Sequence, residues 1–374
     1  MRPGAQEGDA RVLVVGQDPE VLEFVLQELA GAGVPARGTT LADVDGAHGA
    51  FDLVAFGAGT PHQDRKRLQG RFAAANPTAR FLRTYAPYAA AQVLAAVGAA
   101  ASAETLDLKA YCRRIGYGGP LEPTLETLHA LQAHHLAAIP FEAIDVLLGR
   151  HVDISPAAVD AKLIARGRGG YCYEQNGLFK RVLTAIGFEV DALVASVRWQ
   201  APAGAPPPPR THMALRVTVD GAPWLVDVGF GSAVPAAPLR LDRRDPQSAG
   251  DGRYRVTPLG AGFLVRTEAD GQWLPLYDVS PEPLLDSHYE LFNWFTSTHP
   301  SSHFRRQLIV TKATPEARFA LLDSKLTIRA RTGEAERRRL DADGIAHVLE
   351  SVFGLTPAPD WRPVLAAAAE RGAS

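Results

Sequence analysis

Near the middle of the chain stands the stretch RGGYCYEQN, residues 168–176, with Cys172 at its centre. Two glycines precede the cysteine, so the backbone can bend tightly there and leave the thiol accessible. The residues that follow keep apolar positions at a helical spacing as far as Ile186, and Gly187 is a good residue to end that helix. Cys172 is therefore predicted to lie at the start of a helix, where unpaired N–H groups stabilise an anion.

Two short motifs downstream supply the other groups that a reactive thiol needs. They are RTHM at residues 210–213, which contains His212, and WLVDVGFG at residues 224–231, which contains Asp227. A thiol attacks well only as the thiolate, which an adjacent base supplies, and a third group orients the base. A helix start and a neighbouring imidazolium can lower the pKa of a thiol from about 8.5 to roughly 3.5–7.5. Thiol, imidazole and carboxylate in this order point to acyl transfer through a thioester on Cys172.

The turn between the two motifs allows a geometric test. Asp220-Gly221 is a strong signal for a two-residue type I′ hairpin turn. Counting along the ladder from that turn places Asp227 opposite Ala214, two residues beyond His212. Because side chains alternate along a strand, His212 and Asp227 should share a face as diagonal neighbours, about 7–8 Å apart at the backbone. A one-residue bulge would put them on opposite faces.

Composition and charge narrow the class of protein. The chain has 374 residues, of which 46% are hydrophobic and 21% charged, ordinary values for a soluble globular protein of two or three domains. A net charge of -2 gives no general attraction to nucleic acid or to an anionic membrane. No apolar run approaches the ~20 residues of a membrane helix, and residues 1–8 lack the apolar core of a signal peptide. With only two cysteines we expect no disulfide framework and a cytoplasmic location, where a reactive thiol stays free.

The first hundred residues predict a small α/β domain. Strands are expected at residues 11–15, 34–38, 51–56 and 80–85, and helices at 19–29 and 89–97. This alternation is typical of a small, mostly parallel sheet and resembles a shortened receiver-like or Rossmann-like module. The module is degenerate, because Gly16 opens no G-x-G-x-x-G fingerprint and Gly57 stands where a receiver carries its phosphoacceptor aspartate. We interpret residues 1–100 as an accessory domain and residues 101–106 as a linker.

The rest of the chain changes from helical to alternating patterns. Residues 107–189 are predicted to be mostly helical, with Thr124 as the cap of a helix that Pro140 ends. From Val190 the apolar period becomes two, and short strands between turn residues predict an antiparallel barrel or sandwich. Later strands are expected at 307–311 and 325–330, and a closing helix at 344–353.

Several other polar residues have structural interpretations. Cys112 is interpreted as an ordinary buried cysteine. Two histidine pairs lack a complete ligand set with Cys172, so we expect helix-surface or loop roles and no metal. These pairs are His134-His135 and His299 with His303. Arg168 and Glu174, which flank the nucleophile, are expected to make structural ion pairs or hydrogen bonds.

These motifs together resemble the arylamine N-acetyltransferase family over residues 107–355. Many landmarks follow one another in the family's order, which makes the resemblance specific. Besides the Cys172 stretch they are AYCRRIGY at 110–117, TLETL at 124–128, IPFE at 139–142, THM at 211–213, VDVGFG at 226–231 and NWFTSTHP at 293–300.

The resemblance implies an α+β multidomain fold with a cysteine-protease-like core. The implied parts are a helical domain at 107–189 with the nucleophile, an antiparallel β-barrel at 190–300 with the histidine and aspartate, and an α/β lid with the C-terminal tail at 301–374. The N-terminal α/β domain departs from the family pattern, because the family begins near the residue that corresponds to Leu106. It leaves room for an unidentified partner.

The resemblance also implies a reaction. Acetyl-CoA would be the co-substrate, and an acetyl-Cys172 thioester would pass the acetyl group by a ping-pong route to the nitrogen of an arylamine, arylhydrazine or hydrazide. His212 would move the proton and Asp227 would fix its tautomer. By the same resemblance, Thr211, Phe230, Gly231 and Phe304 would bind the co-substrate, and Trp199 and Gln175 would bind the acceptor. Such an enzyme of xenobiotic metabolism takes small molecules, and neither nucleic acid nor membrane is expected as a partner.

Three other interpretations stay open at this stage. An amide synthase that releases an acyl chain from a carrier protein would use the same triad with a different donor. A non-catalytic module would sense a ligand through the N-terminal domain and keep the triad as a relic. A cysteine protease would also fit the order of cysteine, histidine and aspartate, although the surrounding motifs do not suggest one.

Overall fold

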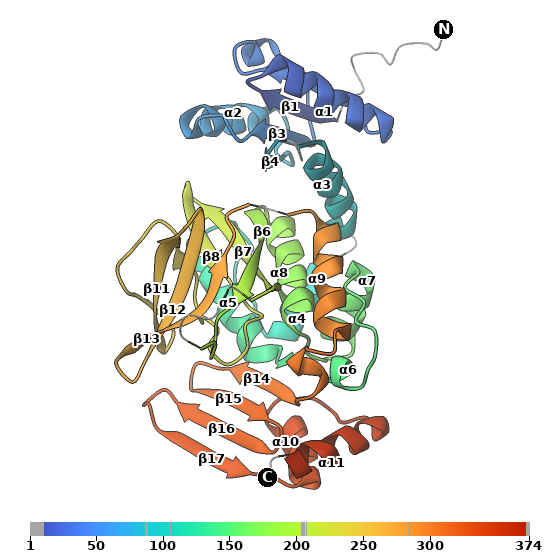
Figure 1. The fold of residues 1–374 in the computed structure, drawn as a ribbon. Helices are drawn as coiled ribbons and strands as arrows, with labels where there is room; N and C mark the ends of the chain where they lie inside the picture. The colour runs from blue at the N-terminus through green and yellow to red at the C-terminus, as the bar shows by residue number, and fades with distance from the viewer. Residues whose placement is uncertain are drawn as a thin grey trace. The chain divides into compact units, whose positions relative to one another are not determined.

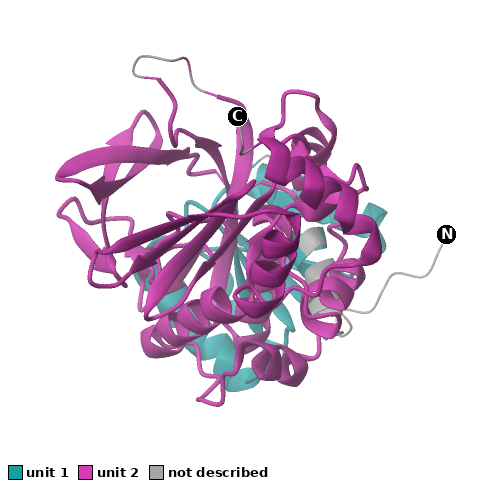
Figure 2. Cartoon of the chain, turned by 90° about the horizontal axis from the view of Figure 1, so that it is seen from below, with its two compact units in different colours: residues 1–105 teal, residues 106–374 magenta. Residues whose placement is uncertain are grey.

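The computed structural model describes residues 11–371, except 87, 88, 105, 203–205, 207 and 283. The expectation that residues 1–8 hold no signal peptide therefore concerns residues outside this description. The chain divides into two compact units, residues 1–105 and 106–374, which Figure 2 colours separately. Over the described part of the chain, no helix combines the length and apolar character that crossing a bilayer requires.

The first unit is a four-stranded parallel sheet (Figure 1) with the strand order β2-β1-β3-β4. This is the order of the first four strands of a flavodoxin-like, doubly wound sheet. It matches the alternation of strand and helix read from the sequence. The elements are β1 (Val12–Gly16), α1 (Pro19–Gly31), β2 (Ala36–Thr40), the 3-10 turn η1 (Val44–Gly46), β3 (Leu53–Gly57), α2 (His62–Ala75), β4 (Arg80–Thr84) and α3 (Ala89–Glu104).

Strand β1 is buried on both faces of this sheet. Val12 and Val14 pack with side chains of α1 and α3, whereas Leu13 and Val15 pack with side chains of α2. A strand covered on both sides by helices reads as a continuous apolar run. That is the pattern the first strand shows.

The first four residues of the expected linker at 101–106 are helical. Helix α3 continues to Glu104, and the boundary between the two units follows residue 105. The segment is rich in alanine, the residue with the highest helix propensity. A lack of large side chains therefore does not by itself indicate a linker.

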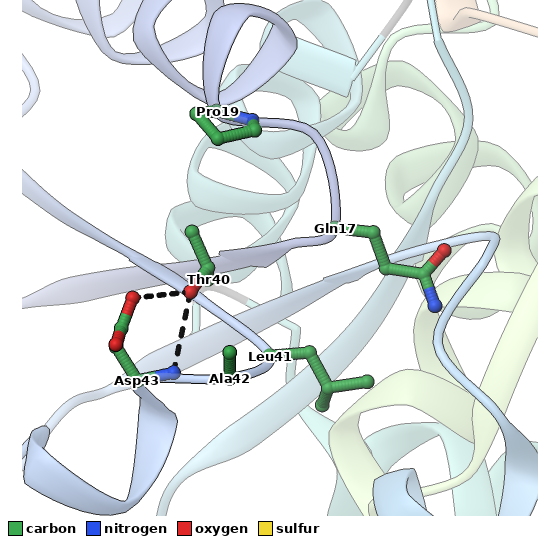
Figure 3. A pocket seen from close by; sticks show the side chains of 6 residues that line it. All are labelled: Gln17, Pro19, Thr40, Leu41, Ala42 and Asp43. Carbon is green, nitrogen blue, oxygen red and sulfur yellow. Dashed lines mark hydrogen bonds between the residues drawn. The ribbon is translucent and has the colours of Figure 1, made fainter.

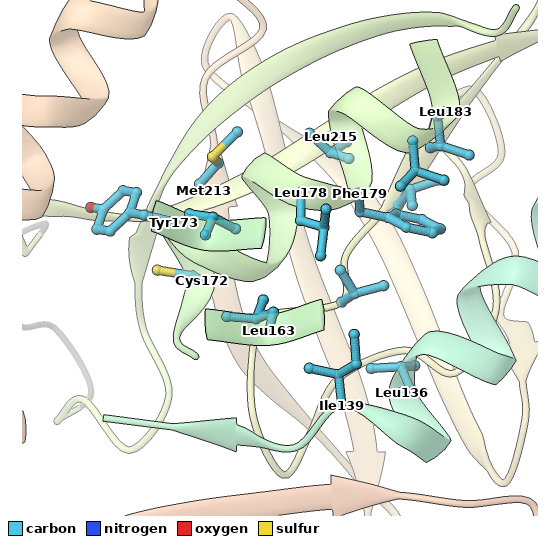
Figure 4. Close-up of a cluster of buried hydrophobic side chains, with 14 of the residues drawn as sticks. Leu136, Ile139, Leu163, Cys172, Tyr173, Leu178, Phe179, Leu183, Met213 and Leu215 are labelled. Carbon is cyan, nitrogen blue, oxygen red and sulfur yellow. The ribbon is translucent and has the colours of Figure 1, made fainter. Parts of the chain in front are cut away.

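The second unit begins with helices that surround α8. Caps define their ends: Thr124 accepts a hydrogen bond from the Thr127 N–H at the start of α5, and Gly187 closes α8 with a φ of 106°. The buried faces of these helices form the main core of the unit, which includes Cys172 (Figure 4). The elements are α4 (Leu108–Ile115), α5 (Leu125–Ala138), β5 (Phe141–Glu142), α6 (Ile144–Leu147), α7 (Pro156–Val159), the π-helical η2 (Asp160–Ala165) and α8 (Cys172–Ile186).

An eight-stranded antiparallel sheet follows, with the order β10-β11-β12-β13-β6-β7-β8-β9. Its two edge strands are tied together by the Gln247 side chain, which accepts from the Arg240 N–H at 2.7 Å and donates to the Arg240 carbonyl at 2.9 Å. The sheet is thus close to a barrel. Its strands are β6 (Glu189–Val197), β7 (Arg210–Val219), β8 (Ala222–Val226), β9 (Leu239–Arg240), β10 (Gln247–Ala249), β11 (Gly252–Leu259), β12 (Gly262–Ala269) and β13 (Gln272–Val279).

Residues 190–300, expected to form the β-barrel domain, also contain a helix after the last strand, α9 (Asp286–Thr298). A five-stranded sheet in the order β17-β16-β15-β14-β5 follows it, so β5 joins the helical part of the chain to the C-terminal part. Helices α10 and α11 pack with this sheet in a separate core. The remaining elements are η3 (His303–Arg305), β14 (Ile309–Ala313), β15 (Ala317–Leu322), β16 (Lys325–Ala330), β17 (Ala335–Arg339), α10 (Ala342–Ser351), η4 (Pro359–Trp361) and α11 (Arg362–Arg371). The whole chain has an α+β fold.

Candidate active site

Cys172 is the first residue of α8, as the sequence predicts. The N–H of Tyr171, just before it, donates to the Glu174 carboxylate at 3.1 Å and closes the first turn. The cysteine is only 3% exposed. It is therefore buried, whereas we expected an accessible thiol. The free N–H groups at the start of the helix place partial positive charge near the sulfur.

Gly169 and Gly170 are not required by an unusual backbone conformation, since neither has a positive φ. They are required by close packing. A Cβ at Gly169 would lie 2.2 Å from the carbonyl oxygen of Pro140, and one at Gly170 would lie 2.8 Å from a Glu174 carboxylate oxygen. The Gly170 carbonyl also accepts a hydrogen bond from the Glu142 N–H at 3.1 Å. Only glycines let the segment before the nucleophile lie this close to β5.

Strands β7 and β8 form the hairpin that the Asp220-Gly221 turn predicts. Both turn residues have positive φ, 50° and 75°, as a type I′ turn requires. The ladder pairs Leu215 with Val226 at its open end, so the predicted register is confirmed. Asp227 follows directly after the last pair and reaches His212 on the same face.

The imidazole and the carboxylate are hydrogen-bonded. His212 Nε2 lies 2.7 Å from Asp227 Oδ2, and both residues are buried. The other carboxylate oxygen, Oδ1, accepts from the Gly229 N–H at 2.8 Å and from Asn176 Nδ2 at 3.0 Å. Because Nε2 is bound to the carboxylate, Nδ1 is the ring nitrogen left for the thiol.

The pKa of His212 reflects both neighbours. Burial alone would lower it, but the charge and hydrogen bond of Asp227, together with those of Cys172, raise the pKa of His212 to about 10. Cys172 Sγ also lies 3.7 Å from the Thr211 carbonyl oxygen, to which it can donate. The structure therefore brings the three predicted residues into one site.

Two aromatic rings enclose the imidazole. The ring centroids of Phe230 and Tyr277 lie 5.2 Å and 5.0 Å from that of His212, and 4.8 Å from each other. Burial and the nearby charge of Asp227 raise the pKa of Tyr277 well above its usual value, so its phenol is neutral. The carboxylate and the imidazole thus interact in an environment that is largely shielded from water.

Three further residues predicted to bind the co-substrate lie in the second unit. Thr211 directly precedes His212, and its carbonyl faces the sulfur. Gly231 has a φ of 88°, a left-handed conformation that favours glycine. Phe304 packs edge-on against Tyr171 and also contacts Phe141, at a centroid distance of 6.0 Å in each case.

The two residues predicted to bind the acceptor lie in different surroundings. Trp199 is half-buried against the core of the eight-stranded sheet. Gln175 is fully buried, and its oxygen lies 2.8 Å from Nε2 of His135, whose Nδ1 lies 2.9 Å from the Tyr111 hydroxyl. Its amide nitrogen donates to the carbonyls of Pro140 and Gly170, each at 3.0 Å. The burial of Gln175 and its bonds to His135, Pro140 and Gly170 do not support its assignment to the acceptor wall.

The histidine pairs have structural surroundings. Burial lowers the pKa of His135 to about 4, so it is neutral within its hydrogen-bond chain. His134 lies 3.1 Å from the Ile115 carbonyl oxygen, and His299 stacks on Phe295. Among the described residues, no group of three or more histidine, cysteine or acidic side chains is arranged to hold a metal ion.

A buried ion network lies behind the nucleophile. Arg168 and Glu174 both belong to it, with separate partners: Arg168 pairs with Glu142 at 2.7 Å, and Glu174 pairs with Lys162 at 2.7 Å. Asp145 joins the two pairs, because it lies 2.7 Å from Lys162 and 3.2 Å from Arg168. These ion pairs confirm the structural interpretation of Arg168 and Glu174.

The first unit contains a separate hollow of about 650 Å³ at the carboxyl ends of β1 and β2 (Figure 3). Its lining includes Gln17, Pro19, Thr40 and Asp43. Asp43 accepts a hydrogen bond from the Thr40 hydroxyl at 2.5 Å, and its own N–H donates to the same hydroxyl at 3.2 Å. The only acidic side chain of this lining is thus bound within the protein.

Two residues of the site were not predicted from the sequence. Asn176 bonds to the carboxylate of Asp227, and Tyr277 packs against His212. Asn176 carries a readable signal, because it lies one helical turn after Cys172 and so shares its face of the helix. Tyr277 comes from a distant strand, and no local pattern relates it to the hairpin.

Comparisons with known proteins all point in one direction. A family model described as N-acetyltransferase matches residues 124–360, all within the second unit. An arylamine N-acetyltransferase of Mycolicibacterium smegmatis is 42% identical over 256 residues, which are 67% of this chain and 92% of the relative. An arylamine N-acetyltransferase of Escherichia coli is 34% identical and is covered to 88% of its length.

Solved structures give the same result. The arylamine N-acetyltransferase of Mycobacterium marinum in complex with CoA is 39% identical, with a TM-score of 0.67. The match covers 71% of this chain and 99% of that one. The arylamine N-acetyltransferase of Salmonella typhimurium is 33% identical, with a TM-score of 0.66 and 98% of its chain covered.

Proposed function

The chain belongs to the arylamine N-acetyltransferase family of enzymes, and from that premise we propose that it carries out acetyl transfer from acetyl-CoA to the nitrogen of arylamines, arylhydrazines or hydrazides. The reaction follows a ping-pong route through an acetyl thioester on Cys172. The observation that carries this proposal is the buried His212–Asp227 pair at 2.7 Å beside the thiol. The relative crystallised with CoA supports the choice of donor.

In the first half of the reaction Cys172 takes the acetyl group. The sulfur gives its proton to Nδ1 of His212 and attacks the acetyl carbonyl carbon as the thiolate. The bond from that carbon to the CoA sulfur breaks, and the CoA thiolate leaves with the proton that His212 returns. Asp227 accepts from Nε2, which keeps Nδ1 toward the sulfur and stabilises the imidazolium.

In the second half the acceptor amine takes the acetyl group. Its nitrogen attacks the thioester carbon, His212 accepts a proton from that nitrogen, and the bond to the Cys172 sulfur breaks. The products are the amide and the thiolate beside a protonated imidazole, the starting state of the next cycle. Every proton in this route is carried by His212.

The residues that would hold the co-substrate are those nearest the triad. Thr211 and Phe230 border His212, and Gly231 follows directly on the Asp227 segment. Phe304 reaches the site through its contact with Tyr171, next to the nucleophile. Trp199 remains our candidate for the acceptor side.

Steady-state kinetics test the proposed route. The rate of acetylation of a simple arylamine is measured while acetyl-CoA and the amine are both varied. We expect parallel double-reciprocal lines, because CoA leaves before the amine reacts. Intersecting lines would require both substrates on the enzyme at once and would contradict the thioester intermediate. If the enzyme turned over an acyl chain on a carrier protein and did not turn over acetyl-CoA, the donor would be the carrier-bound chain and the enzyme would be an amide synthase.

A further inference from the structure

Asn176 is a fully buried amide on α8 that contacts three parts of the site. Its oxygen accepts from the Val228 N–H at 3.0 Å, and its nitrogen donates to the Met213 carbonyl at 2.8 Å and to Asp227 Oδ1 at 3.0 Å. Because Val228 offers a donor and the other two groups are acceptors, only one orientation of the amide satisfies all three. The side chain is therefore fixed, and it holds the carboxylate in a fixed position.

This amide joins the helix of the nucleophile to the strand of the base and to the acid. Asn176 lies four residues after Cys172, so both side chains lie on the same face of α8. Met213, which follows His212 on β7, is bound through its carbonyl. The three catalytic residues come from separate elements. Asn176, on the helix of Cys172, bonds to Asp227 itself and to Met213, the residue next to His212.

The packing around Gly229 shows how closely these elements approach. A Cβ at Gly229 would lie 2.7 Å from the Cys172 Cα and 2.8 Å from Asn176 Nδ2. The Gly229 N–H donates to the same oxygen of Asp227 that Asn176 holds. The segment after the acid thus lies directly on the first turn of α8.

We propose that Asn176 is a positioning residue, which holds the carboxylate of Asp227 toward His212 and fixes Cys172 relative to both. The proposal rests on the proposed function only for the identity of the nucleophile, and its test needs no acetyl-CoA. Without the amide, Oδ1 keeps the Gly229 N–H but loses the donor that ties it to α8. The carboxylate can then turn, and the thiolate loses its fixed imidazolium partner.

A purely structural role for Asn176 predicts a different result. A buried amide that only fills its hydrogen bonds affects the free energy of unfolding and leaves the reactivity of the thiol unchanged. Gln132 offers a matched control, because it is also a fully buried amide beside Asp227. Its nitrogen donates to the main-chain carbonyls of Asp227 at 3.3 Å and Pro235 at 2.8 Å, and it does not bond to the carboxylate.

The test measures alkylation of Cys172 by iodoacetamide at pH 7 in the full chain, with mass mapping of the modified peptide. In Asn176→Ala we expect the rate at Cys172 to fall about tenfold or more, a change of the size a lost buried hydrogen bond to a charged group gives. In Gln132→Ala we expect a rate within about twofold of the starting protein, whatever its loss of stability. Cys112, whose pKa is raised by burial, is the internal reference in each sample. Equal rates at Cys172 in Asn176→Ala and Gln132→Ala would overturn the proposal.

A second variant keeps the test decisive if Asn176→Ala does not fold. In Asn176→Asp the introduced carboxyl can donate to Asp227 only while it is protonated. At a pH where it is ionised, the two carboxylates repel each other. The other titratable groups facing Asp227 are His212, which also interacts with Cys172, and Tyr277. We expect alkylation of Cys172 that is fast at low pH and falls as the introduced carboxyl ionises, a phase that the starting protein lacks. A profile of the same shape in both proteins would rule out a positioning role.

The two proposals fail separately. A changed alkylation profile in a protein that does not acetylate amines would refute the proposed function and leave the positioning role of Asn176 intact. An unchanged profile in a protein that acetylates amines would refute the positioning role of Asn176 and leave the proposed function intact.

Discussion

At the scale of single residues, the site depends on two charges that are buried together. Asp227 has three hydrogen-bond donors, two of them from outside the imidazole, and His212 is enclosed by two aromatic rings. A buried carboxylate is tolerated only when its lone pairs are satisfied in this way. The carboxylate in turn keeps the imidazole in one tautomer, with Nδ1 toward the sulfur.

The substitution Asp227→Asn tests this tautomer directly. The amide can donate to Nε2, which moves the ring proton to Nδ1 and leaves no base facing the sulfur. We expect kcat to fall by about 10⁴-fold, the effect of the same exchange in a serine protease triad. Asp191→Asn removes a carboxylate that pairs with Arg216 in the same sheet and should keep kcat within a few-fold. A similar loss in both variants would mean that the sheet, and not the tautomer, is affected.

The raised pKa of His212 predicts how stability depends on pH. The folded pKa is about 10, above the usual 6.5, so the stabilisation from the protonated ring is complete below about pH 6.5 and is lost as pH rises toward 10. The difference in unfolding free energy between the protein and His212→Gln, measured with urea, should shrink over this interval. An NMR titration of the imidazole with a midpoint near or below 6.5 would contradict the account.

The residue scale also shows a limit of sequence reasoning. That Cys172, His212 and Asp227 lie close together could be predicted, because three chemically distinct groups stand in separate recognisable motifs. Gln175 could not be placed from the sequence, since it lies only three residues after Cys172. Its contact with His135, which the sequence does not show, turns it toward the core. A polar residue beside a nucleophile gives no sign of whether it faces substrate or interior.

At the scale of elements, the hairpin and α8 were predicted well because each has strong local signals. The Asp220-Gly221 turn fixes the register of β7 and β8, and Gly187 ends α8. Helix α2 gave no clear pattern, because only Leu68 and Phe72 of its fourteen residues are buried. The position of α2 depends on its packing against the sheet, and the spacing of apolar residues in the sequence does not reveal that packing.

Two glycines near α8 give an element-scale prediction with opposite signs. Gly177 lies inside the helix, and a Cβ there would meet no atom within 4 Å, so Gly177→Ala should stabilise the protein by about 0.5–1 kcal/mol with unchanged kcat. A Cβ at Gly229 would lie 2.7 Å from the Cys172 Cα, so Gly229→Ala should push the acid segment away from the helix and lower kcat at least about tenfold. The two substitutions add the same methyl group, so equal effects on kcat would show that the contact at Gly229 does not position the site.

At the scale of the whole molecule, the second unit corresponds to nearly complete relatives. The match to the Mycobacterium marinum structure covers 99% of that protein's chain and 71% of this chain. The first unit has its own two cores and its own sheet. Its role, including any partner, remains a prediction from the sequence, since strand order indicates a fold and not a ligand.

This organisation predicts that residues 106–374 alone fold and keep the activity. All the residues of the triad, the ion network behind it and the Asn176 contacts lie in this range. We expect kcat with acetyl-CoA and a simple arylamine within about threefold of that of the full chain, and a cooperative urea transition. Loss of activity in a truncated protein that unfolds cooperatively would show that the first unit contributes to catalysis.

The most direct test of the central claim is the mass of the intact protein after mixing with acetyl-CoA in the absence of an amine. The account predicts the addition of one acetyl group, which peptide mapping places on Cys172 and which disappears when an arylamine is added. The variant Cys172→Ser should carry no such label that an amine removes. An unmodified protein, or an acetyl group on another residue that arylamines do not remove, would contradict a thioester on Cys172.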